Sequence, residues 1–212
     1  MKLAPPQLPA ALAEAGARDF AAGASLEACR LFNVGLTGVD ARTISLDEVV
    51  LEKAALTEAN LEKMAARDVV VKNCDIAAAK CAEASFQRAS FDGGRMTGLD
   101  CSRGVFKDVT FKGCKLDMTN FRFAKLARVR FIDCVLSDAD FLGAELLDIA
   151  FEDCLLERTE FTQCKLKNVD LRSSQLIELR GWQYLKGAII DSAQLMASAP
   201  YLANELGVKV LD

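Results

Sequence analysis

Every fifth residue of this chain is apolar over most of its length. The run begins at Leu26 and ends at Leu176, and no polar or charged residue interrupts it. Because only 51% of all residues are hydrophobic, chance does not produce such a run. We call these residues the central positions: Leu26, Leu31, Leu36, Ala41, Leu46, Leu51, Leu56, Leu61, Ala66, Val71, Ile76, Cys81, Phe86, Phe91, Met96, Cys101, Phe106, Phe111, Leu116, Phe121, Leu126, Phe131, Leu136, Phe141, Leu146, Phe151, Leu156, Phe161, Leu166, Leu171 and Leu176.

The residue two before each central position forms the second half of the pattern. We call it the small position, because it holds alanine, valine, cysteine, glycine, serine or threonine in most units from residue 84 to residue 174. None of these residues is charged or aromatic, and the other three positions of each unit are mostly polar or charged. Two residues in five therefore suit an interior, and three suit solvent.

A five-residue period fits neither a regular helix nor a regular strand. On a helix, five residues turn the side chain by about 140°, so the central positions would spiral around the rod. On a strand, an odd step would place successive central residues on opposite faces. A chain that turns a corner every five residues resolves the conflict, because four such sides close a coil. Coils stacked about 4.8 Å apart would bury both positions inside a solenoid.

Individual units also resemble a known family. The segments ANLEK (59–63), ASFQR (84–88), ADFLG (139–143) and VDLRS (169–173) are similar to the units of pentapeptide-repeat proteins. The resemblance implies an all-β solenoid, a right-handed quadrilateral β-helix, which we place at residues 24–190. It predicts a rod about 35–40 Å long at the ordinary strand spacing.

The two ends of the chain depart from this pattern. Residues 1–23 are predicted to be an N-terminal cap segment, with a short helix in LPAALAEAG (8–16). After Gly181 the period returns one residue early at Leu185 and Ile190, which predicts a last, distorted coil.

Residues 191–212 are predicted to form a C-terminal helix and tail. Apolar residues recur there at helical spacing, at Leu195, Ala199, Leu202 and Leu206. Asp191 or Ser192 is expected to cap the helix, Pro200 to kink it and Gly207 to end it.

The ending LGVKVLD resembles the C-termini of quinolone-resistance members of the family. That resemblance implies a segment that closes the solenoid and joins two rods as a homodimer. The candidate dimerisation residues are Leu195, Leu202, Leu206 and Val208. Capping within one chain is the alternative.

The residue types argue against catalysis and metal binding. The chain has no histidine, the commonest metal ligand and general base. It has 8 cysteines but no CxxC spacing, and all of them fall at central or small positions. We therefore expect core thiols rather than disulfides, and neither an enzyme nor a cofactor site.

Bulk properties predict a soluble, cytoplasmic protein. The formal net charge of −4 is too small to indicate direct nucleic-acid binding. No apolar run approaches the roughly 20 residues of a membrane helix, and MKLAPPQLPA lacks the apolar core of a signal peptide.

Charge is arranged in two successive bands. Residues 103–130 are mostly basic, and residues 133–160 are mostly acidic. The bands would either attract each other's coils or offer an acidic surface to a basic protein partner. The candidate partner-binding residues of this acidic band are Asp133, Asp138, Asp140, Glu145, Asp148, Glu152, Asp153, Glu157 and Glu160.

Two functional hypotheses follow. The first is a non-enzymatic binding or scaffold protein that acts through its rod surface on an unidentified protein partner. The second comes from the resemblance: some family members mimic DNA, bind DNA gyrase or topoisomerase IV, both type II topoisomerases, and protect them from inhibitors. The mild net charge and the basic band fit this second hypothesis poorly.

Overall fold

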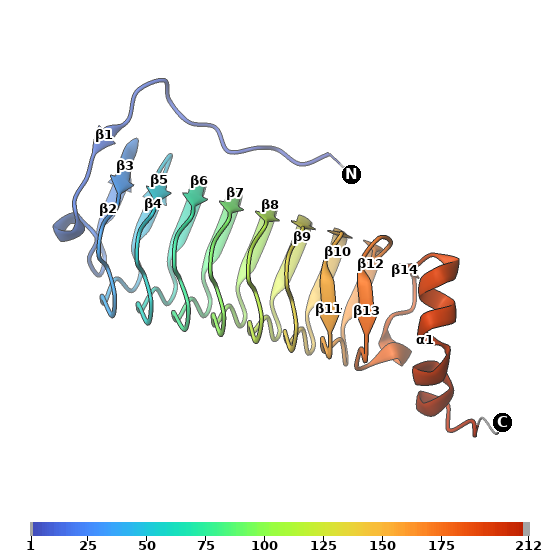
Figure 1. Cartoon of the computed structure of the whole chain (residues 1–212). Helices are drawn as coiled ribbons and strands as arrows, with labels where there is room; N and C mark the ends of the chain where they lie inside the picture. Colours follow the sequence, from blue (N-terminus) through green and yellow to red (C-terminus); the bar gives the residue numbers. More distant parts are fainter. Residues whose placement is uncertain (1, 210–212) are drawn as a thin grey trace.

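The computed structural model describes residues 2–209. The chain forms a right-handed, four-sided parallel β-solenoid of about nine turns, followed by one C-terminal helix (Figure 1). The strands are β1 (Ala13–Glu14), β2 (Ser25–Glu27), β3 (Cys29–Phe32), β4 (Ser45–Asp47), β5 (Val50–Glu52), β6 (Ala65–Lys72), β7 (Ser85–Asp92), β8 (Val105–Lys112), β9 (Lys125–Ile132), β10 (Glu145–Glu152), β11 (Leu155–Glu157), β12 (Lys165–Asp170), β13 (Gln175–Ile177) and β14 (Ala188–Ile189). The helices are the 3-10 turns η1 (Ala17–Asp19) and η2 (Trp182–Tyr184) and the α-helix α1 (Ser192–Glu205).

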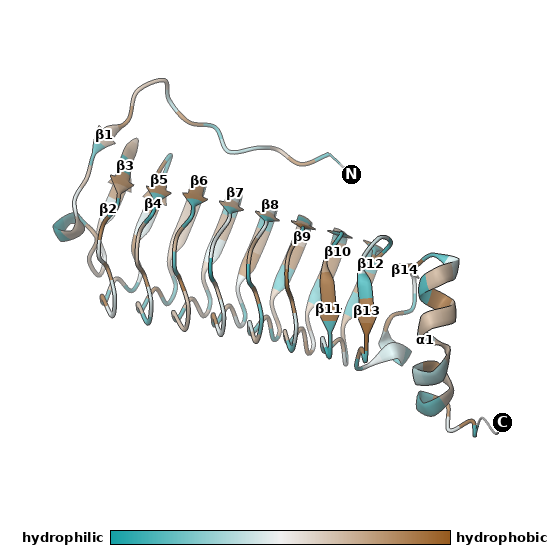
Figure 2. Ribbon diagram, viewed as in Figure 1, coloured by the Kyte–Doolittle hydropathy of each residue, from teal (hydrophilic) through white to brown (hydrophobic). Residues whose placement is uncertain are grey.

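Neighbouring coils pair in parallel with an offset of 20 residues. Phe91 lies beside Phe111, Phe111 beside Phe131 and Phe131 beside Phe151 in the ladder of β7, β8, β9 and β10. The remaining sides pair through single bridges at the same offset, such as Asn60 with Lys80. The predicted fold class is therefore confirmed, and Figure 2 shows hydrophobic and hydrophilic residues interleaved along each coil.

Each corner requires an unusual backbone conformation. The residue two after a central position adopts a left-handed conformation, as at Asp68 (φ 54), Arg88 (φ 52) and Asp108 (φ 58). This conformation costs a residue with a Cβ about 1–2 kcal/mol. The cost recurs at nearly every corner, so the ladder hydrogen bonds and the buried core must offset it.

Part of the core is built from columns of stacked phenylalanines. Phe91, Phe111, Phe131 and Phe151 form one column, with ring centroids 4.7, 5.1 and 4.8 Å apart and nearly parallel planes. A second column contains Phe121, Phe141 and Phe161, and its rings meet the first column edge-on, at 87° between Phe131 and Phe141. Both arrangements are favourable for aromatic rings.

The small positions contain a repeated hydrogen bond. Thr119, Thr159 and Ser174 donate their hydroxyls to the carbonyl of the central residue 23 positions earlier, at 3.2, 2.9 and 3.0 Å. The thiol of Cys134 occupies the equivalent place, 3.5 Å from the Phe111 carbonyl. Buried hydroxyls at small positions therefore have partners, as a buried polar group requires.

All eight cysteines are buried and free, as expected for core thiols. Burial raises the pKa of the Cys81 and Cys164 thiols to about 12, so neither forms a thiolate near neutral pH. Within residues 2–209, no cluster of three side chains is arranged to hold a metal ion.

The prediction of an N-terminal helix at residues 8–16 is wrong. This segment is extended, and its only regular structure is β1, which pairs in parallel with β3 through Ala13 and Cys29. Alanine-rich composition favoured a helix, but Pro9 and strand pairing prevail. The turn η1 follows, and Phe20, with 1% of its surface exposed, covers the first coil.

The last coil and its helix close the other end. Val169 pairs with Ala188 rather than with residue 189, so the predicted one-residue shift is confirmed. Asp191 caps α1 by accepting from the Gln194 backbone N–H at 2.9 Å. Gly207, with φ 69, follows the C-cap residue Leu206.

No helix in the described part of the chain is long and apolar enough to span a membrane.

Phe131→Ala tests the importance of the aromatic columns. Phe131 is 0% exposed and contacts rings on both sides, so the change should lower the free energy of unfolding by about 3–5 kcal/mol. Phe123→Ala is the matched control, because that ring is 51% exposed and should lose less than about 1 kcal/mol. Equal losses in chemical denaturation would contradict the role of the column.

Candidate protein-binding surface

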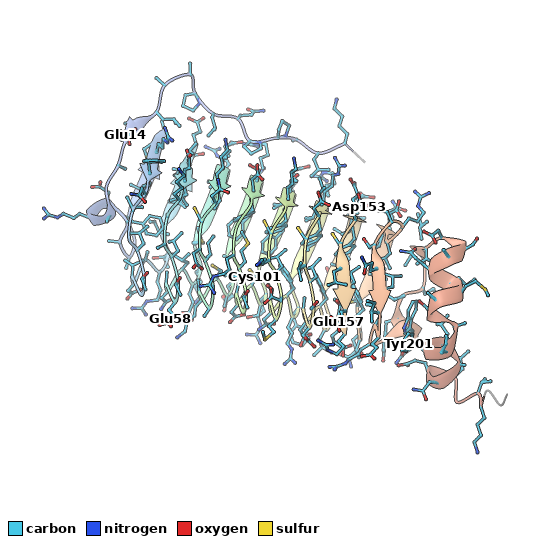
Figure 3. All side chains as sticks on the ribbon, viewed as in Figure 1. Glu14, Glu58, Cys101, Asp153, Glu157 and Tyr201 are labelled. Carbon is cyan, nitrogen blue, oxygen red and sulfur yellow. The ribbon has the colours of Figure 1, made fainter. Side chains whose placement is uncertain are left out.

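The predicted acidic band does not form one acidic face. Its residues are consecutive in sequence, but a 20-residue coil distributes them over all four sides. Figure 3 shows Asp153 and Glu157 at opposite edges of the rod. Acids that are close in sequence therefore lie on different sides of the rod, and no side carries the whole band.

Five of the nine acidic candidates form ion pairs with bases, mostly on a neighbouring coil. Asp140 lies 2.6 Å from Arg122, Glu152 2.7 Å from Arg130, and Glu145 3.0 Å from Lys165. Asp138 lies 2.7 Å from Arg158, which also pairs with Glu157. The first of the two readings, attraction between coils of opposite charge, thus accounts for these acids.

The remaining four candidates are Asp133, Asp148, Asp153 and Glu160, and no ion pair is found for them within residues 2–209. Asp148 accepts a hydrogen bond from Asn168 at 2.8 Å, and Glu160 accepts one from the backbone of Thr162 at 2.7 Å. Asp133 and Asp153 are exposed and occupy the same corner of adjacent coils, 20 residues apart. We call these two residues the acidic corner.

A mixed-charge hollow of about 250 Å³ brings three candidates together. Asp138, Asp140 and Glu160 lie in it beside three arginines, and its lining residues are Arg122, Asp138, Asp140, Leu142, Arg158, Glu160, Thr162 and Arg180. Because each acid has a base nearby, the hollow offers both signs of charge to a partner rather than a negative field.

Ion pairs between coils recur along the whole rod. Asp68 pairs with Arg88, and Asp108 with Arg128 at 2.7 Å, each across 20 residues. The guanidinium of Arg128 holds the pKa of Asp108 below its ordinary value, against the opposing effect of burial. Arg88 lowers the pKa of Asp68 in the same way. These are charge-assisted pairs on partly buried carboxylates, stronger than ordinary surface pairs.

The predicted dimerisation residues lie on α1 or directly after it, and they are not the residues that are buried against the solenoid. The residues of α1 that are buried against the solenoid are Gln194 and Ser198. The Gln194 side chain donates to the Leu171 and Ser174 carbonyls, both at 2.7 Å. Open backbone carbonyls at the end of a solenoid need donors, so a polar residue faces them.

The outward side of α1 is consequently apolar. Leu195 is 49% exposed and Leu206 79%, and Val208 in the tail is exposed as well. Leu202 is half-buried against the core. Met196, 75% exposed, extends this surface, and the helical spacing of the leucines did not reveal it. We call Leu195, Met196, Leu206 and Val208 the end face; residues 210–212 of LGVKVLD lie outside the described residues.

Comparison with known proteins identifies the family. A sequence profile of the pentapeptide repeat region matches residues 44–121 and 105–180. The chain belongs to the pentapeptide-repeat family. A search of curated protein sequences finds no match.

Two solved structures are similar to this chain. One is a trypsin-treated variant of QnrB1, a plasmid-mediated fluoroquinolone resistance protein, with 20% identity and a TM-score of 0.55 over 95% of this chain and 97% of that one. Another is HetL, a protein involved in heterocyst differentiation regulation from the cyanobacterium Nostoc sp. strain PCC 7120. It shows 17% identity and a TM-score of 0.45 over 79% of this chain and 90% of that one.

Asp108→Asn tests the ion pairs between coils. Loss of the ionised partner of Arg128 should lower the free energy of unfolding by about 1–2 kcal/mol at pH 7. The folded-state pKa of Asp108 is lowered, so its contribution is present above the unfolded value and is lost as pH falls through the folded value. The deficit of the variant should therefore shrink below about pH 4.

Chemical denaturation at pH 7 and pH 3 measures this change. Asp133→Asn is the control, since that exposed carboxylate forms no ion pair within residues 2–209, and the change should alter stability by less than about 0.5 kcal/mol. A deficit that is as large at pH 3 as at pH 7 would contradict the assignment to an ionised pair.

Proposed function

We propose that this protein is a non-enzymatic rod that binds a protein partner through its charged sides and pairs with a second copy through its end face. The observation that carries the proposal is the orientation of α1. Gln194 and Ser198 are buried against the solenoid, whereas Leu195, Met196 and Leu206 are exposed to solvent, and an exposed apolar surface is a common mark of an interface. The family's repeats supply the scaffold that presents both surfaces.

Partner binding is assigned to two separate surfaces, the acidic corner and the mixed-charge hollow on another side of the rod. Asp133 and Asp153 carry negative charge that no neighbouring base in the described chain neutralises by an ion pair, so they attract a basic protein surface more strongly than the paired acids. The hollow beside Asp138 and Arg158 supplies both donors and acceptors for polar recognition.

Protection of DNA gyrase or topoisomerase IV is the second candidate. It is favoured by the likeness in fold to QnrB1 over nearly the full length of both chains. The ion pairs count against it, because a DNA mimic needs a continuous negative surface, and here arginines such as Arg122 and Arg158 neutralise acids of the band.

Leu195→Glu/Leu206→Glu tests pairing through the end face. Wild-type protein should elute with a mass near twice the 23.0 kDa of one chain, and the variant near one. A buried charge at an apolar interface is strongly unfavourable, which is the reason for the expected dissociation. Light scattering after size exclusion measures the mass.

Phe32→Glu is the control for that experiment, because Phe32 is an exposed apolar residue on β3, far from α1. It should leave the mass unchanged. A wild-type protein that remains a single chain at micromolar concentration would contradict pairing through the end face.

Charge reversal at the acidic corner tests partner binding. Immobilised wild-type rod should retain the partner from a lysate of the source cells, and Asp133→Lys/Asp153→Lys should retain about tenfold less, since rim charges control association. Glu58→Lys, an exposed reversal on another coil, is the matched control. If the double variant retains the same protein as well as wild type does, the acidic corner is not the binding surface.

A gyrase supercoiling assay with and without a quinolone separates the two candidates. Inhibition or protection by wild-type protein, lost in Asp133→Lys/Asp153→Lys, would support the second candidate. Neither effect at micromolar protein would exclude it and leave the unidentified partner.

A further inference from the structure

Residues 2–16, which we call the strap, run along the outside of the rod. In Figure 1 this segment crosses above the strands from β1 toward the C-terminal coils. The Gln7 backbone N–H donates to Asp68 Oδ1 at 2.9 Å, and the Ala4 N–H donates to Asp108 Oδ1 at 3.4 Å. Three residues of strap thus span two coils of the solenoid.

The match of three strap residues to two coils has a geometric reason. An extended polyproline II chain rises about 3.1 Å per residue, so three residues cover about 9.3 Å. Two coils at the strand spacing cover about 9.6 Å. Pro5 and Pro6 favour this conformation. Leu3, Pro6, Leu12 and Ala15 are half-buried at a spacing of three or six, whereas Pro9 and the other residues between them are exposed. The three-residue repeat of the strap therefore matches the two-coil spacing of the aspartates along the corner.

The groove follows one corner of the solenoid. Aspartate and arginine alternate along that corner, one per coil, in the column Asp68, Arg88, Asp108, Arg128, Asp148 and Asn168. Each arginine binds the aspartate of the preceding coil, which orients the carboxylate and leaves acceptor capacity for a backbone N–H. Two residues after the positions of this corner lie small side chains that are paired from coil to coil, and we call them the floor: Val50, Val70, Ser90 and Thr110.

The groove extends beyond the strap. Asp68 and Asp108 are only 3% and 7% exposed, whereas Asp148, the next carboxylate of the column, is half-exposed and accepts from Asn168. A hollow of about 430 Å³ surrounds Asp148, lined also by Arg130, Ala150, Glu152 and Asp170. A third carboxylate of the column, two coils beyond Asp108, thus accepts no backbone N–H from residues 2–16.

We propose that this corner groove is a docking surface for an extended, proline-containing segment of a partner protein, and that the strap is its internal occupant. Recognition uses backbone N–H groups at every third residue, which meet the carboxylates of Asp68, Asp108 and Asp148. Small or apolar side chains of the segment lie on the floor. The tethered strap competes at high effective concentration, so a partner segment gains by reaching Asp148 as well.

Proline substitutions release the strap without changing the groove. In the full-length chain, Ala4→Pro/Gln7→Pro removes both N–H donors but retains the backbone angle of an extended segment. Gln7→Ala is the matched control, because it keeps the N–H. A labelled synthetic peptide with the sequence of residues 2–12 is the probe, and fluorescence anisotropy measures its binding.

The peptide should bind the double-proline protein saturably, one peptide per chain, and at least about tenfold more tightly than it binds wild type or Gln7→Ala. Adding Asp68→Asn/Asp108→Asn to the double-proline protein should weaken binding by about tenfold, because charge-assisted acceptors are lost. A peptide with proline at the positions of Ala4 and Gln7 should not bind.

Circular dichroism and the thermal midpoint establish that each variant is folded, and Gln7→Pro alone replaces the double variant if that one is not. Absence of saturable binding to the folded, strap-released protein would overturn the proposal. Equal binding of the two peptides, or equal binding to wild type, would also overturn it.

Discussion

The 20-residue register of the backbone ladder is the constraint on which the rest of the structure depends. Because the coils from β7 to β10 pair in parallel at a constant offset, each side chain there lies about one strand spacing from its equivalents in the neighbouring coils. Phenylalanine therefore stacks on phenylalanine, and small-position hydroxyls meet carbonyls of the coil before. The left-handed corners are tolerated because this repetition recovers their cost in every coil.

The same register decides what surface charge can do. A base placed 20 residues after an acid, as at Asp138 and Arg158, is its neighbour on the next coil. Acids and bases that form separate bands in the sequence therefore form ion pairs between coils. Only acids without such a partner, such as Asp133 and Asp153 at their shared corner, remain as a negative surface. Acidic residues thus serve both stability and partner recognition. Whether a base follows about 20 residues later decides which of the two roles an acid has.

The fold could be predicted from the sequence because a single period determines all central positions from Leu26 to Leu176. The ends could be predicted only in part: the shifted last coil and the helix capped by Asp191 were expected, but the contacts of the two terminal segments do not follow from repetition. The residues before Gly16 have helical propensity, yet strand pairing and the Asp68 and Asp108 carboxylates keep them extended. On α1 the leucine spacing predicted an apolar stripe for dimerisation, but it did not show that the open carbonyls of the last coil are met by Gln194. The candidate acids were found individually, although their distribution over four sides requires the coil geometry.

The two ends of the solenoid are closed in different ways, and this limits how copies could assemble. At the N-terminal end Phe20 is buried over the first coil, and the following strap leaves along the side of the rod. At the C-terminal end α1 satisfies the open backbone with polar groups and turns Leu195 and Leu206 outward. An apolar surface at one end of a rod can pair with itself in a symmetric dimer, and both copies of that surface are then buried. Association through α1 would therefore stop at two copies and would not extend into a filament.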